Sequence, residues 1–116
     1  MSPIEIRYVH HLGRLTKRLE ESRKFYREIL GFEEIERPNF DFQGAWLYNY
    51  GVQIHLIVNP AAPDPVGEIN SRVNHLALHV DDLDAAREKL IAAGIPFKES
   101  AVPGRKVRQL FFRDPD

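Results

Sequence analysis

The side chains with the clearest capacity for chemistry are five histidines, in a chain that has no cysteine. Neutral imidazole nitrogens bind divalent ions such as Zn, Ni, Mn, Co or Fe, and the lack of thiols excludes disulfides and thiolate metal sites. The five are His10, His11, His55, His75 and His79. Their spacing indicates which of them can meet at one ion.

Two pairs are poor candidates for joint ligation. His10 and His11 are neighbours in an expected strand, so their side chains point to opposite faces. His75 and His79 share a face of another expected strand, but four residues separate them by roughly 13 Å. A zinc-peptidase helix motif is also excluded, because Leu76 stands where a glutamate would follow the first histidine.

Three histidines remain in favourable positions. His11-Leu12 and His75-Leu76 occur at equivalent places in two similar halves of the chain, which can carry the two rings to opposite sides of one cleft. His55 lies in an expected strand whose apolar residues alternate, which leaves its ring on the face opposite the core. We therefore predict that His11, His55 and His75 bind one divalent metal ion.

Short strands and two helices must position these side chains. The first half predicts a strand over about 7–15, a helix over 19–30 ended by Gly31, and strands over 32–37, 45–50 and 52–58. Residues 59–72 are rich in proline and predict a connector. The second half predicts a strand over 73–80, a helix over 83–93 begun by Asp81-Asp82 and ended by Gly94, and strands over 95–99 and 107–113.

The order of elements is therefore β-α-β-β-β followed by β-α-β-β, which indicates two copies of one unit. We predict an α+β fold in a single domain over 1–116, with module 1 over about 7–58, a linker over 59–72 and module 2 over about 73–116. The second copy is one strand short, and that strand would begin beyond Asp116.

Composition excludes several classes of function. The chain has 17 acidic and 16 basic residues and a formal net charge of −1, which gives no basic surface for nucleic acid or an anionic membrane. No apolar run approaches the length of about 18 residues that spans a bilayer. Without a secretory signal or a cysteine framework, the expected compartment is the cytoplasm.

Several runs resemble a known family. Within the stretch from His11 to Phe32, Leu19-Glu20-Glu21-Ser22 is followed by Phe25-Tyr26 and Leu30-Gly31-Phe32. This stretch is similar to the opening unit of the vicinal oxygen chelate superfamily, which includes glyoxalase I, bleomycin-resistance proteins, fosfomycin-resistance transferases, methylmalonyl-CoA epimerase and extradiol dioxygenases. Further similar runs are Gly44 to Gly51, Ile54-His55-Leu56, Asn74 to Leu78 and Phe111 to Asp116.

The resemblance implies paired βαβββ modules whose curved mixed sheet encloses a cleft with one divalent metal ion. It places His11, His55 and His75 at metal-ligand positions of the family. The family's last ligand is a glutamate on the eighth strand, which would lie beyond Asp116, so the catalytic carboxylate is not identified.

The function that the resemblance implies is that of a glyoxalase-like lyase or isomerase, in which the ion holds two neighbouring substrate oxygens. An extradiol-type dioxygenase is an alternative, since two histidines and one carboxylate leave positions on iron for dioxygen. A non-catalytic protein that binds a drug or another small molecule is a third possibility. A homodimer is expected in each case.

Substrate contacts are predicted from strand alternation. Gln109, Phe111 and Arg113 lie opposite the apolar face of their strand, and Arg113 is a candidate for an anionic group. The aromatic stripe of Trp46, Tyr48 and Tyr50 is expected to face the core of the sheet, which would leave Asn49 or Leu47 facing the cavity.

Overall fold

The computed structural model describes residues 1–104 and 106–116 and divides into two compact units, 1–62 and 63–116. The boundary falls in the predicted linker. The secondary structure is a mixed sheet with few helices, so the predicted α+β class is confirmed. No helix within the described residues is both long and apolar enough to span a membrane.

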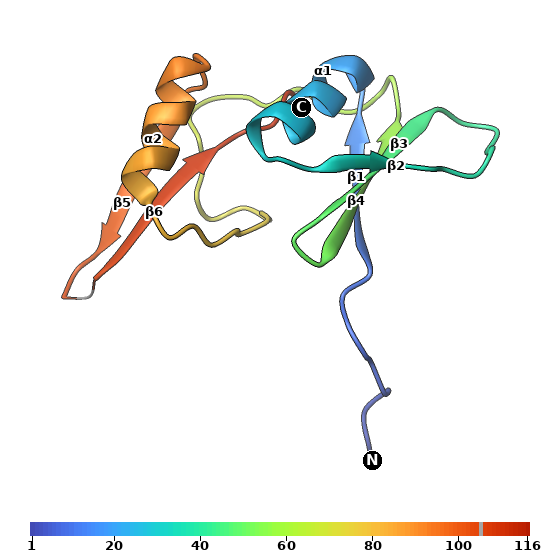
Figure 1. The fold of residues 1–116 in the computed structure, drawn as a ribbon, viewed down its shortest axis with the longest axis horizontal. Coiled ribbons are helices and arrows are strands. Elements are labelled where there is room, and N and C mark those ends of the chain that lie inside the picture. The colour runs from blue at the N-terminus through green and yellow to red at the C-terminus, as the bar shows by residue number, and fades with distance from the viewer. Residues whose placement is uncertain (105) are drawn as a thin grey trace. The chain divides into compact units, whose positions relative to one another are not determined.

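The first unit has the predicted order β-α-β-β-β (Figure 1). Its elements are β1 (His11–Thr16), α1 (Leu19–Lys24), the π-helical turn η1 (Phe25–Ile29), β2 (Glu33–Ile35), β3 (Gly44–Asn49) and β4 (Val52–Val58). The strand order is β1-β4-β3-β2, with β1 parallel to β4 and the other neighbours antiparallel. The first and last strands of the unit therefore lie side by side.

A tight turn sets the register between β3 and β4. Tyr50 and Gly51 both have positive φ angles, of 53° and 75°, as a two-residue type I′ hairpin turn requires. This turn pairs Trp46 with His55 and Tyr48 with Gln53. Gly44 is required at the far end of β3, because a Cβ there would lie 2.2 Å from the backbone oxygen of Leu56.

The core of the first unit lies between the sheet and the helix. Leu47, Ile54 and Leu56 are almost completely buried on one sheet face, and α1 contacts β3 and β4. Two buried hydroxyls, those of Thr16 and Ser22, hydrogen-bond at 3.0 Å and join the end of β1 to the helix. The helix therefore covers the sheet face that carries Leu47, Ile54 and Leu56.

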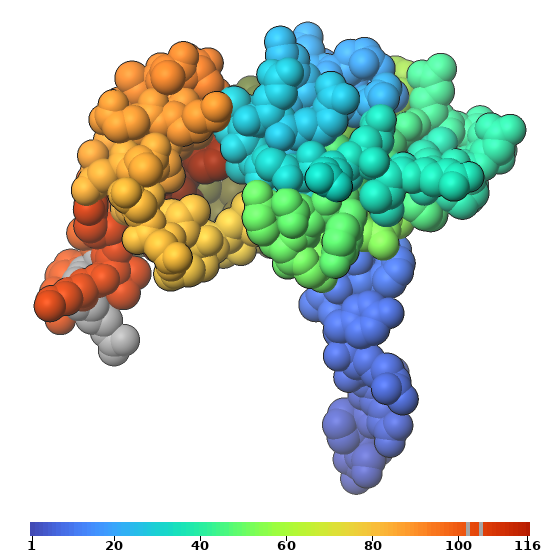
Figure 2. Space-filling model, in the orientation of Figure 1, coloured from blue at the N-terminus to red at the C-terminus, as the bar shows by residue number. Residues whose placement is uncertain are grey.

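The predicted first strand is shorter than expected. It was predicted from about residue 7 but begins at His11, since β4 begins at Val52 and the register pairs His11 with Gln53. The backbone hydrogen bond from Gln53 N to His10 O lies at the N-terminal end of β1, and within the described chain no residue before His11 has a register partner in β4. Residues 1–10 are exposed and stand out from the first unit as a narrow column (Figure 2).

The second unit contains α2 (Leu83–Ala92), β5 (Phe97–Val102) and β6 (Val107–Phe112). β5 and β6 form an antiparallel pair, and α2 contacts β6. The predicted helix start is confirmed, because the Asp82 side chain accepts a hydrogen bond from Ala85 N at 3.0 Å. Gly94 follows the helix with a φ of 69°, as its predicted role at the helix end requires.

The strand predicted over 73–80 is not formed in the described part of the chain. Its counterpart in the first unit, β1, gains its hydrogen bonds from β4. Within the described residues, no strand pairs with residues 73–80. Periodicity predicted the face that these residues would present, but a strand also needs a paired backbone.

Candidate functional site

The sheet face opposite the helix carries the candidate site. The buried series Ile54 and Leu56 turns one face of β4 to the core, so Gln53 and His55 point to the other face, as predicted. On the neighbouring strands, Trp46 is the register partner of His55, and His11 is the partner of Gln53. Strand pairing therefore brings four side chains from three strands to one place.

His55 lies at the centre of this group. Its ring is stacked between His11 and Trp46, with centroid separations of 4.0 and 4.1 Å and an interplanar angle of 8° in both cases. Its Nε2 lies 2.8 Å from Gln53 Oε1. Only 8% of the residue is exposed.

Burial lowers the pKa of His55 from 6.5 to about 4, and the nearby charges that His11, His10 and Arg37 can carry act in the same direction. The imidazole is therefore neutral at physiological pH. A neutral ring is the form that binds a metal ion.

His11 is more accessible than His55 and has a second histidine as its neighbour. The Nδ1 atoms of His10 and His11 lie 2.9 Å apart, and the two rings meet edge to face. The prediction that these side chains diverge to opposite faces is therefore wrong. Strand alternation does not apply to the pair, because His10 precedes the first residue of β1.

The residue types on this face suit a divalent ion, but one ring must turn before both can bind it. A metal–nitrogen bond lies near the plane of the imidazole, and parallel planes about 4 Å apart share no common point. Consistent with this, no group of three or more histidine, cysteine or acidic side chains within the described residues is arranged to hold an ion. The exposed His11 ring is the one with room to rotate.

His75, the third predicted ligand, belongs to the second unit. Its Nδ1 lies 2.7 Å from Val73 O, and its ring meets Phe111 edge to face at 6.2 Å. Two residues of the predicted site, His75 and Phe111, are thus neighbours within that unit. Whether His75 joins His11 and His55 at one ion stays a prediction.

The remaining predicted substrate contacts have different surroundings. Arg113 Nη2 donates to Glu68 O at 2.8 Å and is also near Val66 O, so its side chain holds a loop of its own unit. Gln109 is exposed on β6, opposite Ser100 of β5. Asn49 donates from Nδ2 to Gly31 O at 2.8 Å and accepts from Tyr50 N, which ties the β3 turn to the end of the helical segment. Their contacts with a substrate stay predictions.

The predicted orientation of the aromatic stripe on β3 is wrong. Leu47 is completely buried, whereas Tyr48 is 47% exposed, so Trp46 and Tyr48 face away from the core. The larger rings were expected inside, but the space beneath the helix is already occupied by aromatic residues such as Phe25 and Tyr26. Trp46 is consequently part of the histidine group.

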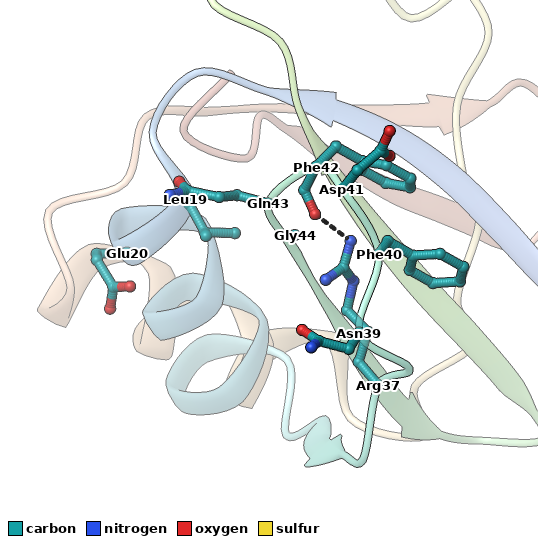
Figure 3. A pocket seen from close by; sticks show the side chains of 9 residues that line it. All are labelled: Leu19, Glu20, Arg37, Asn39, Phe40, Asp41, Phe42, Gln43 and Gly44. Atoms are coloured by element: carbon teal, nitrogen blue, oxygen red, sulfur yellow. Dashed lines mark hydrogen bonds between the residues drawn. The ribbon is translucent and has the colours of Figure 1, made fainter.

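A hollow of about 460 Å³ lies beside the loop before β3 (Figure 3). Its lining consists of Leu19, Glu20, Arg37, Asn39, Phe40, Asp41, Phe42, Gln43 and Gly44. Arg37 Nη2 donates a hydrogen bond to Phe42 O at 2.8 Å, and the guanidinium carbon lies 4.9 Å from the ring centroids of Phe40 and Phe42. These contacts hold together the loop before β3. None of the predicted site residues lines this hollow, and the histidine face is the better candidate.

Comparison with models of protein families shows the family to which this chain belongs. Residues 8–116 match the model of the Glyoxalase/Bleomycin resistance protein/Dioxygenase superfamily. The chain belongs to this superfamily. A relative from Arabidopsis thaliana named Glyoxylase I 4 is 35% identical over 121 residues, which span 99% of this chain and 69% of the relative.

Solved structures of the superfamily have the same fold. A glyoxalase/dioxygenase from Nostoc punctiforme is 27% identical, with a TM-score of 0.78 over 100% of this chain and 89% of its own. The antibiotic binding protein TnmS3 from a Streptomyces species is 25% identical, with a TM-score of 0.70 over 98% and 92%. FosX, a fosfomycin resistance protein of Listeria monocytogenes solved with Mn(II), is 21% identical and has a TM-score of 0.73 over 97% and 85%.

For this member of the superfamily, strand alternation predicts Gln53 on the same strand face as His55, but the sequence did not single out Gln53 or Trp46 as neighbours of the proposed ligands. A signal for Gln53 was present, because it lies two residues before His55 and therefore on the same strand face. The role of Trp46 depends on the β3–β4 register, which only the Tyr50-Gly51 turn fixes.

Proposed function

We propose that this chain is a divalent-metal-dependent lyase or isomerase of the glyoxalase type, acting on a small substrate with two neighbouring oxygen atoms. The observation that carries the proposal is the meeting of the His11 and His55 rings, 4.0 Å apart, on one sheet face. The 35% identity to Glyoxylase I 4 over nearly the whole chain supports the same class of reaction.

The proposed ligands are His11, His55 and His75, with a glutamate beyond Asp116 as a further ligand and proton carrier. A divalent ion held there supplies Lewis-acid stabilisation of negative charge on the substrate oxygens. FosX, which has the same fold, was solved with Mn(II). We also propose that the protein is cytoplasmic and that it forms a homodimer. Sedimentation velocity tests the homodimer, because it measures the mass of the assembly.

The chain's own residues have separate tasks in this proposal. His55 keeps a free lone pair because it stays neutral, and the Trp46 ring covers one of its faces and excludes water there. Phe111 beside His75 offers an apolar contact for the substrate, and Gln109 offers a hydrogen bond. Arg113 and Asn49 reach a substrate only by giving up the backbone bonds described above.

A second candidate function is binding of a small molecule without catalysis. It is favoured by a continuous run of aromatic contacts from Phe42 through Phe40 and Trp46 to His55, a surface on which a planar molecule can stack. The structural relative TnmS3 is an antibiotic binding protein.

Metal analysis of the purified chain, with four single variants, tests the proposal. His11→Ala, His55→Ala and His75→Ala should each lower the bound metal at least tenfold, whereas His79→Ala should not, because His79 is exposed and faces Asp81. Isomerisation of a hemithioacetal should follow the metal content across the series.

Three outcomes oppose the proposal. No metal in the parent chain, with tight binding of a planar aromatic compound, would establish the binding protein. Iron that is retained in His55→Ala, together with cleavage of a catechol ring, would establish the extradiol-type dioxygenase. Equal loss of metal in His79→Ala would show that binding is unspecific.

A further inference from the structure

The His55 ring is held in place by two side chains that are not themselves proposed ligands. Gln53, two residues earlier on β4, meets its Nε2 at 2.8 Å. Trp46, its register partner on β3, lies parallel to its face at 4.1 Å. One contact lies in the plane of the ring and the other is perpendicular to it, so together they oppose both rotation and tilting.

The contact with Gln53 also selects the tautomer. An amide oxygen accepts hydrogen bonds but cannot donate one, so the proton of the neutral His55 ring lies on Nε2. The lone pair is then on Nδ1, which has no hydrogen-bond partner within the described residues. Nδ1 is therefore the atom that His55 can offer to a metal ion.

His11 differs from His55 in both respects. Its hydrogen bond is to another imidazole, His10, which can donate or accept, so its tautomer is not fixed by the partner. Its ring is on the open side of the stack, whereas His55 is enclosed between His11 and Trp46. His11 can leave the stack by giving up its contact with His10, whereas His55 is covered on both faces.

We propose that Trp46 and Gln53 are positioning residues of the metal site: they hold His55 as a preset ligand with Nδ1 open, so that of the two proposed ligands in the first unit only His11 has to turn. This inference rests on the proposed function, since it assigns the two residues to the same ion. Residues that bind the second nitrogen of a ligand histidine typically raise metal affinity by 10- to 100-fold.

The tautomer is tested first, by nitrogen-15 NMR of the imidazole rings in the metal-free protein at pH 8. We expect His55, assigned by the loss of its signals in His55→Asn, to show a single tautomer with protonated Nε2. Gln53→Leu, which keeps the bulk but removes the acceptor, should give a mixture of tautomers. Gln53→Glu retains an acceptor oxygen and should restore the single form.

Metal affinity is tested next, by titration with Zn²⁺ or Co²⁺. Gln53→Leu and Trp46→Leu should each weaken binding about tenfold, whereas Gln53→Glu and Trp46→Phe should recover most of the affinity. Leu15→Ala is the control, because Leu15 is an exposed apolar residue of the same sheet whose register partner is Ile57, and it should leave affinity unchanged. The His11 ring signals should shift more than those of His55 when the ion binds.

The outcomes separate the two proposals. A mixed tautomer of His55 in a parent chain that binds the ion, or an affinity that neither Leu variant alters, would overturn the positioning role and leave the metal site standing. A single tautomer in a parent chain that binds no ion would overturn the metal site and the positioning role with it.

Discussion

At the scale of single residues, burial and neighbouring charge act together on His55. It is nearly enclosed by two rings, and its pKa is lowered to about 4. The same enclosure has two effects. It keeps the ring in its metal-binding form, and it makes protonation of the ring unfavourable to the fold.

The stability of the metal-free first unit should therefore fall in mild acid. In the unfolded chain His55 regains its ordinary pKa of 6.5, so between pH 6.5 and about 4 the unfolded state binds a proton that the folded state does not. Stability is fully retained above pH 6.5 and is lost as the pH falls through this window. We expect a loss of about 3 kcal/mol of unfolding free energy by pH 4.

Urea unfolding followed by fluorescence measures this loss, because Trp46 is the single tryptophan of the chain and is stacked on His55. His55→Gln should flatten the pH dependence, and His79→Gln, at an exposed position, should preserve it. Identical pH profiles for the parent and His55→Gln would contradict the prediction.

At the scale of elements, the close approach of β3 and β4 depends on a missing side chain. A Cβ at Gly44 would lie 2.2 Å from Leu56 O, and backbone cannot move aside as a flexible side chain can. At Gly13 on β1, a Cβ would lie 3.6 Å from Ile57 Cδ1, an ordinary contact. The two glycines of the same sheet thus have opposite tolerance for substitution.

Gly44→Ala should destabilise the first unit by about 2 kcal/mol or more, because the two strands must separate locally to admit the methyl group. Gly13→Ala should change stability by less than about 1 kcal/mol, since glycine is the less favourable residue in a strand. Denaturant midpoints of both variants provide the measurement. Equal midpoints would show that the sheet yields at Gly44 without cost.

Helix and strand types were predictable because each has a local periodicity. The helix over 19–30 was confirmed in α1 and η1, and the strand over 52–58 was confirmed in β4 at both ends. The alternation in β4 also gave the correct face for His55. The orientation of β3 could not be read in this way, because Trp46 and Leu47 are both apolar and only the space beneath the helix decides between them.

Features that depend on partners distant in the sequence were less predictable. Residues 73–80 have the alternation of a strand but no paired neighbour within the described chain, and His10 contacts His11 although it precedes the first residue of β1. The contacts of Arg113 with Glu68 and Val66 likewise connect remote segments. Periodicity describes which way a side chain points, and pairing determines what it meets.

At the scale of the whole molecule, burial is distributed unevenly between the units. The buried hydrophobic residues described are Phe25, Tyr26, Phe32, Ala45, Leu47, Ile54, Leu56 and Ala62 in the first unit, and Leu90 in the second. Exposed ion pairs, such as Arg87 with Glu99 and Arg108 with Asp84, join α2 to the hairpin of the second unit. Exposed pairs of this kind contribute little to stability.

Hydrogen exchange of the whole chain should therefore show two levels of protection. Amides of β3 and β4 should exchange slowest, and amides of residues 63–80 should exchange within seconds, because few of their groups are buried or paired. Mass spectrometry of peptic fragments measures both. Equal protection across the two units would mean that the second unit is covered by contacts beyond those described.

The parallel pairing of β1 with β4 has a consequence for how the histidine pair arises. The β3–β4 hairpin is closed by two residues and can form early, whereas β1 must find its neighbour across the whole length of the first unit. We therefore expect His55 to be in place before His11 arrives. A chain with only the hairpin formed would present the His55 imidazole alone, so capture of an ion by both rings would require the pairing of β1 with β4.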